Sequence, residues 1–190
     1  MSRPSSSGYA QRLAARQGNG WKRRVPNPYR WYLRHLELGR VLEVGCGVGR
    51  NLGYLEGAGL GIDADPDAVN ICRERGLTAF TPDEFEAAPA SFDALLLSHV
   101  VEHMAPDDAL ALVRRYLPFT RPGGRVVIIT PQERGFASDP THVTFTDLAD
   151  VARMCAAADL RLERQQSFPL PRAFGRVFVY NEFITIARVP

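Results

Sequence analysis

The stretch VLEVGCGVGRN places a carboxylate, Glu43, before glycines at every second position, Gly45, Gly47 and Gly49. Glycine is costly to order, so three glycines this close together indicate a loop where a ligand needs bare backbone. A phosphate loop of a nucleotide hydrolase would need a lysine after the glycines, and none follows. A dinucleotide loop would need its third glycine where Arg50 stands. The spacing therefore favours a cradle for another ligand.

A second group of chemistry-bearing side chains lies in HVVEHM and SDPTHVTF. It contains three of the four histidines of the chain, His99, His103 and His142, together with Glu102. His99 and Glu102 are three residues apart and could share one face of a helical turn, with His103 alongside. Imidazole is the side chain that takes and gives protons near neutral pH, so these residues are candidates for acid–base chemistry.

The elements that must position these residues alternate between short apolar runs and amphipathic stretches, which is typical of βαβ units around a parallel sheet. The sequence predicts strands near 40–45, 59–63, 77–80, 92–98 and 124–130, and helices near 50–56, 66–75 and 106–117. Asp65 is expected to cap the second of these helices, with Pro66 at its first position. RPGG at 121–124 predicts a turn before the fifth strand.

The C-terminal part has a different pattern. A helix near 145–158 precedes two strands, 160–168 and 176–189, which the proline-rich PLPRAFG joins without a helix. Such a pair is a hairpin, and it gives an otherwise parallel sheet an antiparallel strand. We expect residues 1–39 to form a basic, partly disordered extension with a helix around 27–37, and residues 40–190 to form the single α/β domain.

The order of motifs resembles the class I S-adenosylmethionine-dependent methyltransferases. The motifs are the acidic residue and glycines of LEVGCGVG, Asp63 in GLGIDADP, Asp83 in GLTAFTPDEF, FDALLLSHVVEHM, and the turn in LPFTRPGGRVVIITP. The resemblance covers roughly residues 38–188 and includes the terminal hairpin. It implies a Rossmann-like fold with a mostly parallel seven-stranded sheet, helices on both faces, and S-adenosyl-L-methionine as the methyl donor.

The resemblance also implies which residues bind the donor. Gly45 and Gly47 would lie against its methionine part, Glu43 would meet its ammonium group, and Asp63 would accept from both ribose hydroxyls. Asp83 would accept from the adenine amino group, although capping a short helix is an alternative for it. The remaining expected contacts are Cys46, Ala64, Glu84 and Ser98, and for Cys46 a small apolar filler is an alternative role.

On the acceptor side, His-x-x-Glu-His with a later histidine resembles the metal site of small-RNA 3′-end 2′-O-methyltransferases, although His99 stands where their pattern has a glutamate. The resemblance implies a divalent ion such as Mg²⁺ or Mn²⁺ held by His99, Glu102, His103 and His142. Without a metal, His142 or His99 would act as general base, with Glu102 as a further catalytic residue. Both alternatives favour an oxygen acceptor.

Composition limits the partners. Residues 1–40 carry nine basic residues and one acid, a net charge of +8, whereas the other 150 residues carry 14 basic and 20 acidic ones. No apolar run is long enough to span a bilayer, so no membrane partner is expected, and three unpatterned cysteines fit a reducing cytoplasm. The oligomeric state cannot be inferred.

We predict an O-methyltransferase for a hydroxyl-bearing small molecule, such as a saccharide or natural product. The alternatives are an RNA ribose 2′-O-methyltransferase, in which the basic arm follows the phosphates, and a small-molecule N-methyltransferase. Two further functions are less favoured. The intact donor motif argues against a non-catalytic scaffold protein, and Arg50 argues against a nicotinamide dehydrogenase.

Overall fold

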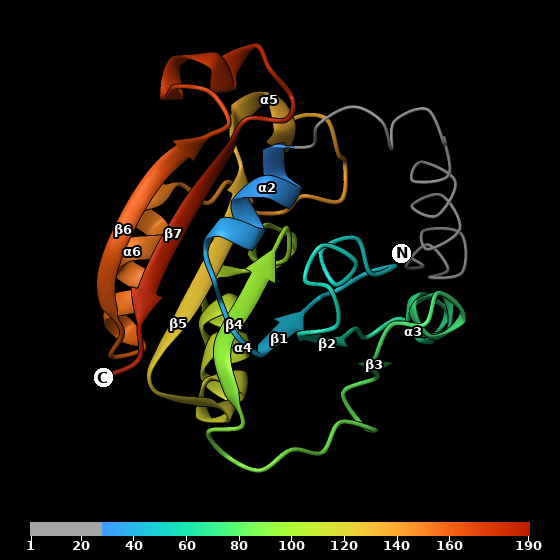
Figure 1. The fold of residues 1–190 in the computed structure, drawn as a ribbon. Helices are drawn as coiled ribbons and strands as arrows, with labels where there is room; N and C mark the ends of the chain where they lie inside the picture. Colours follow the sequence, from blue (N-terminus) through green and yellow to red (C-terminus); the bar gives the residue numbers. More distant parts are fainter. Residues whose placement is uncertain (1–27) are drawn as a thin grey trace.

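The structure is a computed structural model that describes residues 28–190 (Figure 1). Its seven strands form one sheet in the order β3-β2-β1-β4-β5-β7-β6. The strands are β1 (Val41–Val44), β2 (Gly59–Ile62), β3 (Ala79–Phe80), β4 (Phe92–Ser98), β5 (Thr120–Pro131), β6 (Arg161–Phe168) and β7 (Glu182–Arg188). The helices are α2 (Pro28–His35), α3 (Pro66–Glu74), α4 (Pro106–Tyr116), α5 (Glu133–Phe136) and α6 (Leu148–Ala157). Short 3₁₀ turns are η2 (Val101–His103), η3 (Leu117–Phe119) and η4 (Arg172–Arg176).

Strands β1 to β5 pair in parallel, and β7 is antiparallel to both of its neighbours, β5 and β6. This is the predicted α/β, Rossmann-like sheet with a C-terminal antiparallel hairpin. Because parallel strands end at the same edge, the segments after β1, β2, β4 and β5 meet at one end of the molecule. That end must therefore hold the site.

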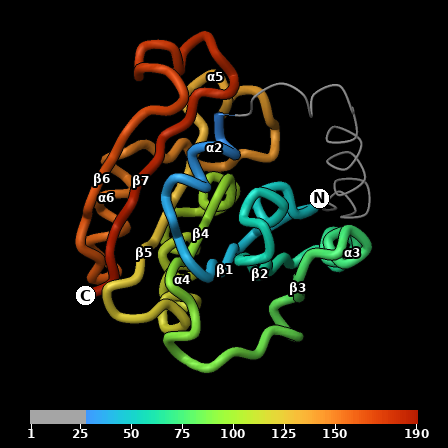
Figure 2. Tube along the Cα trace, in the orientation of Figure 1, coloured from blue at the N-terminus to red at the C-terminus, as the bar shows by residue number. Residues whose placement is uncertain are grey.

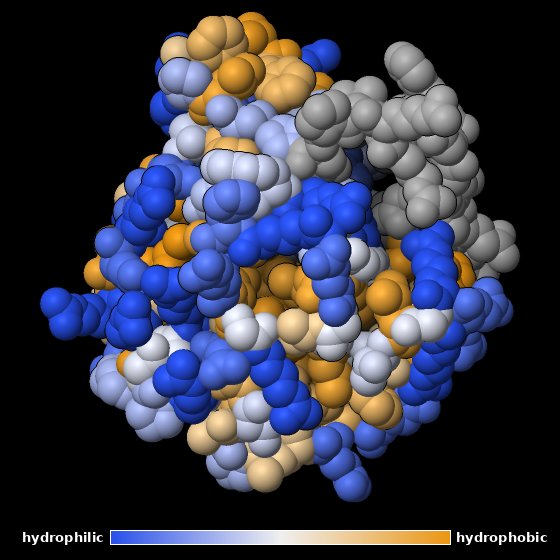
Figure 3. All heavy atoms as spheres, viewed as in Figure 1, coloured by the Kyte–Doolittle hydropathy of each residue, from blue (hydrophilic) through white to orange (hydrophobic). Residues whose placement is uncertain are grey.

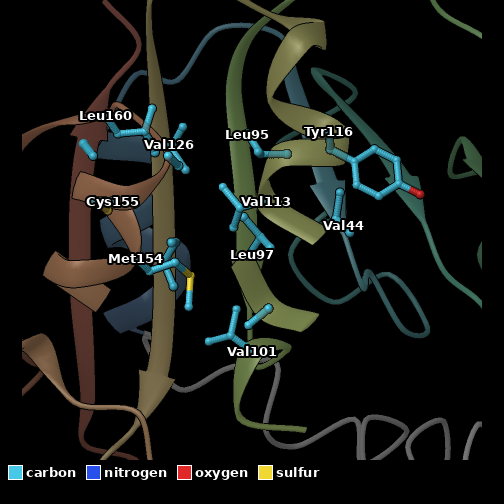
Figure 4. Packing of buried hydrophobic residues seen from close by; sticks show 14 of the residues in the cluster. Val44, Leu95, Leu97, Val101, Val113, Tyr116, Val126, Met154, Cys155 and Leu160 are labelled. Carbon is cyan, nitrogen blue, oxygen red and sulfur yellow. The ribbon is translucent and has the colours of Figure 1, made fainter. Parts of the chain in front are cut away.

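Successive residues of the central strands point to opposite faces of the sheet, and each face has its own core. Leu95 and Leu97 of β4 pack with α4 and α6, as Figure 4 shows. Ala94 and Leu96 of the same strand pack with α2 on the other face. The near-continuous apolar runs of these strands follow from this two-sided burial.

Two helices begin at the kind of cap that the sequence indicates. The Asp65 side chain accepts from the Asp67 N–H at the start of α3, as predicted. Asp147 and Asp150 form a reciprocal capping box at the start of α6. Within residues 28–190, no helix has both the length and the apolar character that crossing a bilayer requires.

Three predicted elements differ from the structure. The helix expected over 50–56 is wrong, because this segment forms consecutive turns; Gly53 interrupts it, Gly49 and Gly57 flank it, and glycine is a poor helix former. The last strand begins at Glu182 rather than near 176, because η4 occupies 172–176. The predicted turn at 121–124 lies within the span of β5, where a register shift against β4 and the positive φ of Gly123, 72°, mark the irregularity.

Candidate active site

The glycine loop leaves β1 with a backbone that favours glycine. Gly45 has φ 73° and Gly47 has φ 52°, both in the left-handed region. The N–H groups of Gly45 and Cys46 donate to the Ile62 carbonyl at 2.8 and 3.1 Å, which ties the loop to the end of β2. A Cβ atom on Gly45 would overlap the side chain of Val100. The sequence therefore places bare backbone at this point for both conformational and packing reasons.

Glu43 lies beneath this loop and is 1% exposed. Asn51 donates to its Oε1 at 2.7 Å, whereas its Oε2 is buried without a hydrogen-bond partner. Burial raises the pKa of Glu43 to about 7, although the Asn51 hydrogen bond opposes this change. A buried carboxylate oxygen without a partner fits a ligand that brings its own cation, such as the ammonium group of S-adenosylmethionine.

Asp63 follows β2 and joins the two loops at this edge. Its Oδ2 accepts from the Gly47 N–H at 2.7 Å, and its Oδ1 accepts from the Asp65 N–H at 2.9 Å. Burial raises its pKa above the usual range, while these two backbone donors oppose the rise. The carboxylate is thus fixed beside the glycine loop, where a ribose with two hydroxyls could reach it.

The other residues expected near the donor differ in burial and in whether their side chains already form hydrogen bonds. Glu84 accepts from the Thr81 N–H and from Arg73, so it closes the turn after β3. Asp83 in the same turn is exposed, as is Ala64. Ser98 is the buried last residue of β4. The Cys46 thiol is also buried and lies against the Gly47 carbonyl, so its role as a small filler agrees with its position.

His99 follows β4 in a left-handed conformation, with φ 59°. Its Nδ1 lies 3.2 Å from Oε1 of Glu102 and its Nε2 lies 2.7 Å from Oε1 of Glu182. Burial would lower the pKa of His99, but Glu182 and Glu102 outweigh that effect and raise it to about 9. Near neutral pH the ring is therefore a cation between two carboxylates. This arrangement favours a positioning role for His99 over that of a general base or metal ligand, because both nitrogens are engaged.

Sequence reasoning missed Glu182, which is separated from His99 by 83 residues. A glutamate at the first position of an otherwise apolar strand, EFITIAR, is the signal that could have indicated it. Its side chain is only 7% exposed. A buried acid at a strand end requires a partner, and His99 is that partner.

Glu102, His103 and His142 form a separate group whose potential ligand atoms all lie within 4.8 Å of one another. The Glu102 carboxylate is 0% exposed, and its Oε2 has no hydrogen-bond partner. His142 Nε2 lies 4.0 Å from its Oε1, and the rings of His103 and His142 have centroids 4.8 Å apart. Of the four residues predicted to bind a metal, the structure thus brings three together and leaves His99 bonded to Glu182 and Glu102.

The loop after β5 folds back onto η2 and places His142 there. The N–H groups of Val143 and Thr144 both donate to the Glu102 carbonyl, at 2.7 and 3.0 Å. The Thr144 hydroxyl donates to the Met104 carbonyl at 2.9 Å. Residues separated by 40 positions are thereby held in register, and the histidines of HVVEHM and SDPTHVTF reach the same point.

A family model described as "Methyltransferase domain" matches residues 14–165. The chain belongs to the methyltransferase-domain family. The predicted recognition as a class I methyltransferase and the predicted enzyme class are confirmed.

Known proteins similar to this methyltransferase agree with that assignment. A Xenopus tropicalis protein, tRNA (carboxymethyluridine(34)-5-O)-methyltransferase alkbh8, is 33% identical over 46% of the chain and 15% of its own length. Trans-aconitate 2-methyltransferase of Sinorhizobium medicae is 26% identical over 70% of the chain and 53% of its own length. The chain thus spans about half or less of these relatives. A SAM-dependent methyltransferase from Archaeoglobus fulgidus has the same fold, with a TM-score of 0.67 and 18% identity over 98% of this chain and 95% of that one.

Proposed function

We propose that this methyltransferase transfers the methyl group of S-adenosylmethionine to a hydroxyl oxygen, and that Glu102, His103 and His142 act on that hydroxyl. The observation that supports this most is the convergence of one buried carboxylate and two imidazoles at the carboxyl end of β4. Glu43, Gly45, Gly47 and Asp63 would hold the donor at the neighbouring strand ends. Methyl transfer from a sulfonium is an in-line displacement, so the enzyme contributes mainly by positioning the acceptor and removing its proton.

The protonation of the two rings supports their role. His142 Nδ1 lies 2.8 Å from the Phe136 carbonyl oxygen, which can only accept, so in the neutral ring Nδ1 carries the proton and Nε2 keeps its lone pair. His103 Nδ1 lies 3.2 Å from the Thr141 carbonyl, and the Thr141 hydroxyl already donates to Asp139. Its Nε2 is therefore also available as an acceptor or ligand.

These three side chains fit a divalent metal ion. Two imidazoles whose Nδ1 atoms lie against carbonyl oxygens leave Nε2 toward an ion, and together with an unsatisfied buried carboxylate oxygen they form a suitable set of ligands. Such an ion, when bound, would lower the pKa of a hydroxyl that coordinates it. Two nitrogen ligands favour Mn²⁺ over Mg²⁺. His99, fixed between Glu182 and Glu102, would hold the Glu102 carboxylate in orientation.

The two relatives differ in the acceptors for which they are named, a tRNA nucleotide in one and trans-aconitate in the other. They therefore support methyl transfer without selecting an acceptor class. The small hydroxyl-bearing acceptor expected from the sequence stays a prediction.

Calorimetric titrations of the purified protein test the proposal. Manganese chloride and S-adenosylhomocysteine would be titrated separately into the wild type, Glu102→Gln, His142→Gln and the control His35→Gln, which alters a histidine in α2. We expect Mn²⁺ affinity to fall at least about tenfold in the first two variants, while S-adenosylhomocysteine affinity stays within about twofold and the control binds both normally.

A transfer assay with methyl-labelled donor tests the acceptor atom. The acceptors would be saccharides, catechol and bulk tRNA, each beside an amine-bearing analogue. Label in hydroxyl acceptors that depends on Glu102 would support the proposal. Label confined to amines would overturn it, and undetectable Mn²⁺ binding with normal transfer would leave His142 as a metal-free base and overturn the metal assignment.

A further inference from the structure

The loop between β6 and β7 presents a group of exposed apolar side chains at the active-site end of the molecule. Val177 is 73% exposed, Tyr180 65%, Phe174 46% and Phe178 37%. Figure 3 shows apolar side chains gathered at this end, over the loop that is dark red in Figure 1. We call this the rim surface, and it comprises Arg172, Phe174, Arg176, Val177, Phe178 and Tyr180. Exposed apolar side chains that cluster in this way mark interaction sites.

The loop that bears the rim surface has a well-built base. Asn181 is fully buried; it donates to Gln132 Oε1 at 3.0 Å and accepts from the Leu170 N–H at 2.9 Å. Arg172 forms a two-pronged ion pair with Glu133 of α5. The polar groups at the base of the loop are hydrogen-bonded and hold the rim surface outward. The exposure of its apolar side chains is therefore a property of the fold.

The rim surface adjoins the acceptor residues through α5. In Figure 2 the red loop between β6 and β7 lies next to α5, and the Arg172–Glu133 pair joins η4 of this loop to α5. The carbonyl of Phe136, the last residue of α5, accepts from His142, and the Phe136 ring stacks on that of His142 with centroids 5.2 Å apart. A partner on the rim surface would therefore lie beside the proposed site of methyl transfer.

Charge complementarity indicates the kind of partner. Residues 28–190 carry 17 basic and 21 acidic residues, whereas residues 169–180 carry two arginines and no acid. Residues 1–27 carry six basic residues and no acid. Helix α2, which follows them in the sequence, begins beside this loop. Tyr29 marks that point, because its hydroxyl donates to the Tyr180 carbonyl at 2.7 Å. Apolar side chains flanked by positive charge fit an anionic surface that also accepts hydrocarbon.

We propose that the rim surface docks the enzyme on an anionic phospholipid bilayer. Phe174, Val177 and Phe178 would enter the boundary between headgroups and acyl chains, while Arg176 meets the lipid phosphates. Phe174, Phe178 and Tyr180 could also stack on bases, but Val177, the most exposed apolar residue of the loop, has no aromatic face and therefore favours this partner over a nucleic acid. Docking of this kind needs no membrane-spanning helix. The acceptor hydroxyl would then belong to a molecule held in the bilayer. This last step rests on the proposed function.

Flotation of the full-length protein with large unilamellar vesicles tests the docking without any turnover. The vesicles would contain phosphatidylcholine with roughly one-third phosphatidylglycerol, or phosphatidylcholine alone. The variants are the double change Val177→Ser with Phe178→Ser, the single change Tyr180→Ser, and the control Leu162→Ser. Leu162 is an exposed apolar residue near the other end of β6. Thermal unfolding would confirm that each variant is folded.

We expect the wild type and Leu162→Ser to float with the anionic vesicles, and the double variant to lose about tenfold or more in partition coefficient. Tyr180→Ser should show a smaller loss of the same sign, and high salt should weaken wild-type binding. Absence of flotation would overturn the proposal, as would equal flotation of the double variant. It would also be overturned by rim-dependent binding of a single-stranded RNA oligomer without vesicle binding, or by a dimer that the double change dissociates. None of these results depends on methyl transfer or Mn²⁺ binding, so the proposed function is tested separately.

Discussion

The two halves of the proposed site, one for the donor and one for the acceptor, are built differently. On the donor side, Glu43, the glycine loop and Asp63 lie within about twenty residues of sequence, and backbone groups do much of the holding. On the acceptor side, His99, Glu102, His142 and Glu182 come from three separate segments, and both side-chain and backbone contacts hold them together. The donor half is thus a local product of β1 and β2, whereas the acceptor half exists only after the whole sheet has formed. Substitutions should affect the two halves independently.

The largest effect is expected when the negative charge of Glu102 is removed from the acceptor half. Glu102→Gln keeps the shape of the side chain and the backbone carbonyl that accepts from Val143 and Thr144. We expect turnover to fall about a thousandfold, as is typical when an acid–base or ligand group is lost, with S-adenosylhomocysteine affinity unchanged. Kinetics and calorimetry on the same preparation measure both. Loss of donor affinity would show that the halves are coupled.

The reciprocal test removes the donor carboxylate. Asp63→Ala deletes the acceptor for two ribose hydroxyls and for the Gly47 N–H, so S-adenosylhomocysteine affinity should fall about a hundredfold. The control is Asp65→Ala, which removes only the cap of α3 and should reduce stability by about 1 kcal/mol. If calorimetry shows that affinity survives the Asp63 change, the ribose contact lies elsewhere.

A subtler test uses the pH dependence of the donor half. Because the pKa of Glu43 is about 7, S-adenosylhomocysteine should bind more weakly as pH falls through that value, since a protonated Glu43 cannot pair with an ammonium. Glu43→Gln should bind about tenfold more weakly at high pH and show a flat profile between roughly pH 6 and 8. A wild-type profile that is equally flat would contradict the ammonium contact.

The same change should stabilise the protein without ligand. The pKa of Glu43 is raised on folding, so its ionised form destabilises the folded state above about pH 7, and the penalty disappears as pH falls toward the unfolded value. Since the new amide also lacks a partner, we expect Glu43→Gln to raise the free energy of unfolding at high pH by only about 1–2 kcal/mol. Denaturant titrations at high and low pH measure the difference.

The smallest expected effect concerns the residue that only positions others. Glu182→Gln keeps a hydrogen-bond acceptor for His99 but removes one of its two carboxylate partners. We expect kcat to fall about fivefold to tenfold with KM for the donor unchanged. An unchanged kcat would show that Glu102 alone orients His99.

The sequence was most informative where chemistry is local. The strands, the hairpin and the Asp65 cap could all be predicted, because apolar runs and capping residues are contiguous signals. Residues 50–56 do not form the predicted helix, because the glycines within and around the segment outweigh its amphipathic pattern. Glu182 could not be assigned, because only the pairing of β7 with β5 brings it to His99. The bonding of His99 likewise depends on that distant partner.

The position of β7 also has a consequence for how the enzyme is made. β7 follows β6 in the sequence, yet it lies between β5 and β6, so β6 has no neighbour in the sheet until β7 arrives. During synthesis from the N-terminus, the proposed donor half can form early, whereas Glu182 emerges only with β7. A chain interrupted before β7 would therefore keep the proposed donor residues but lack Glu182. Such a protein could bind donor without using it.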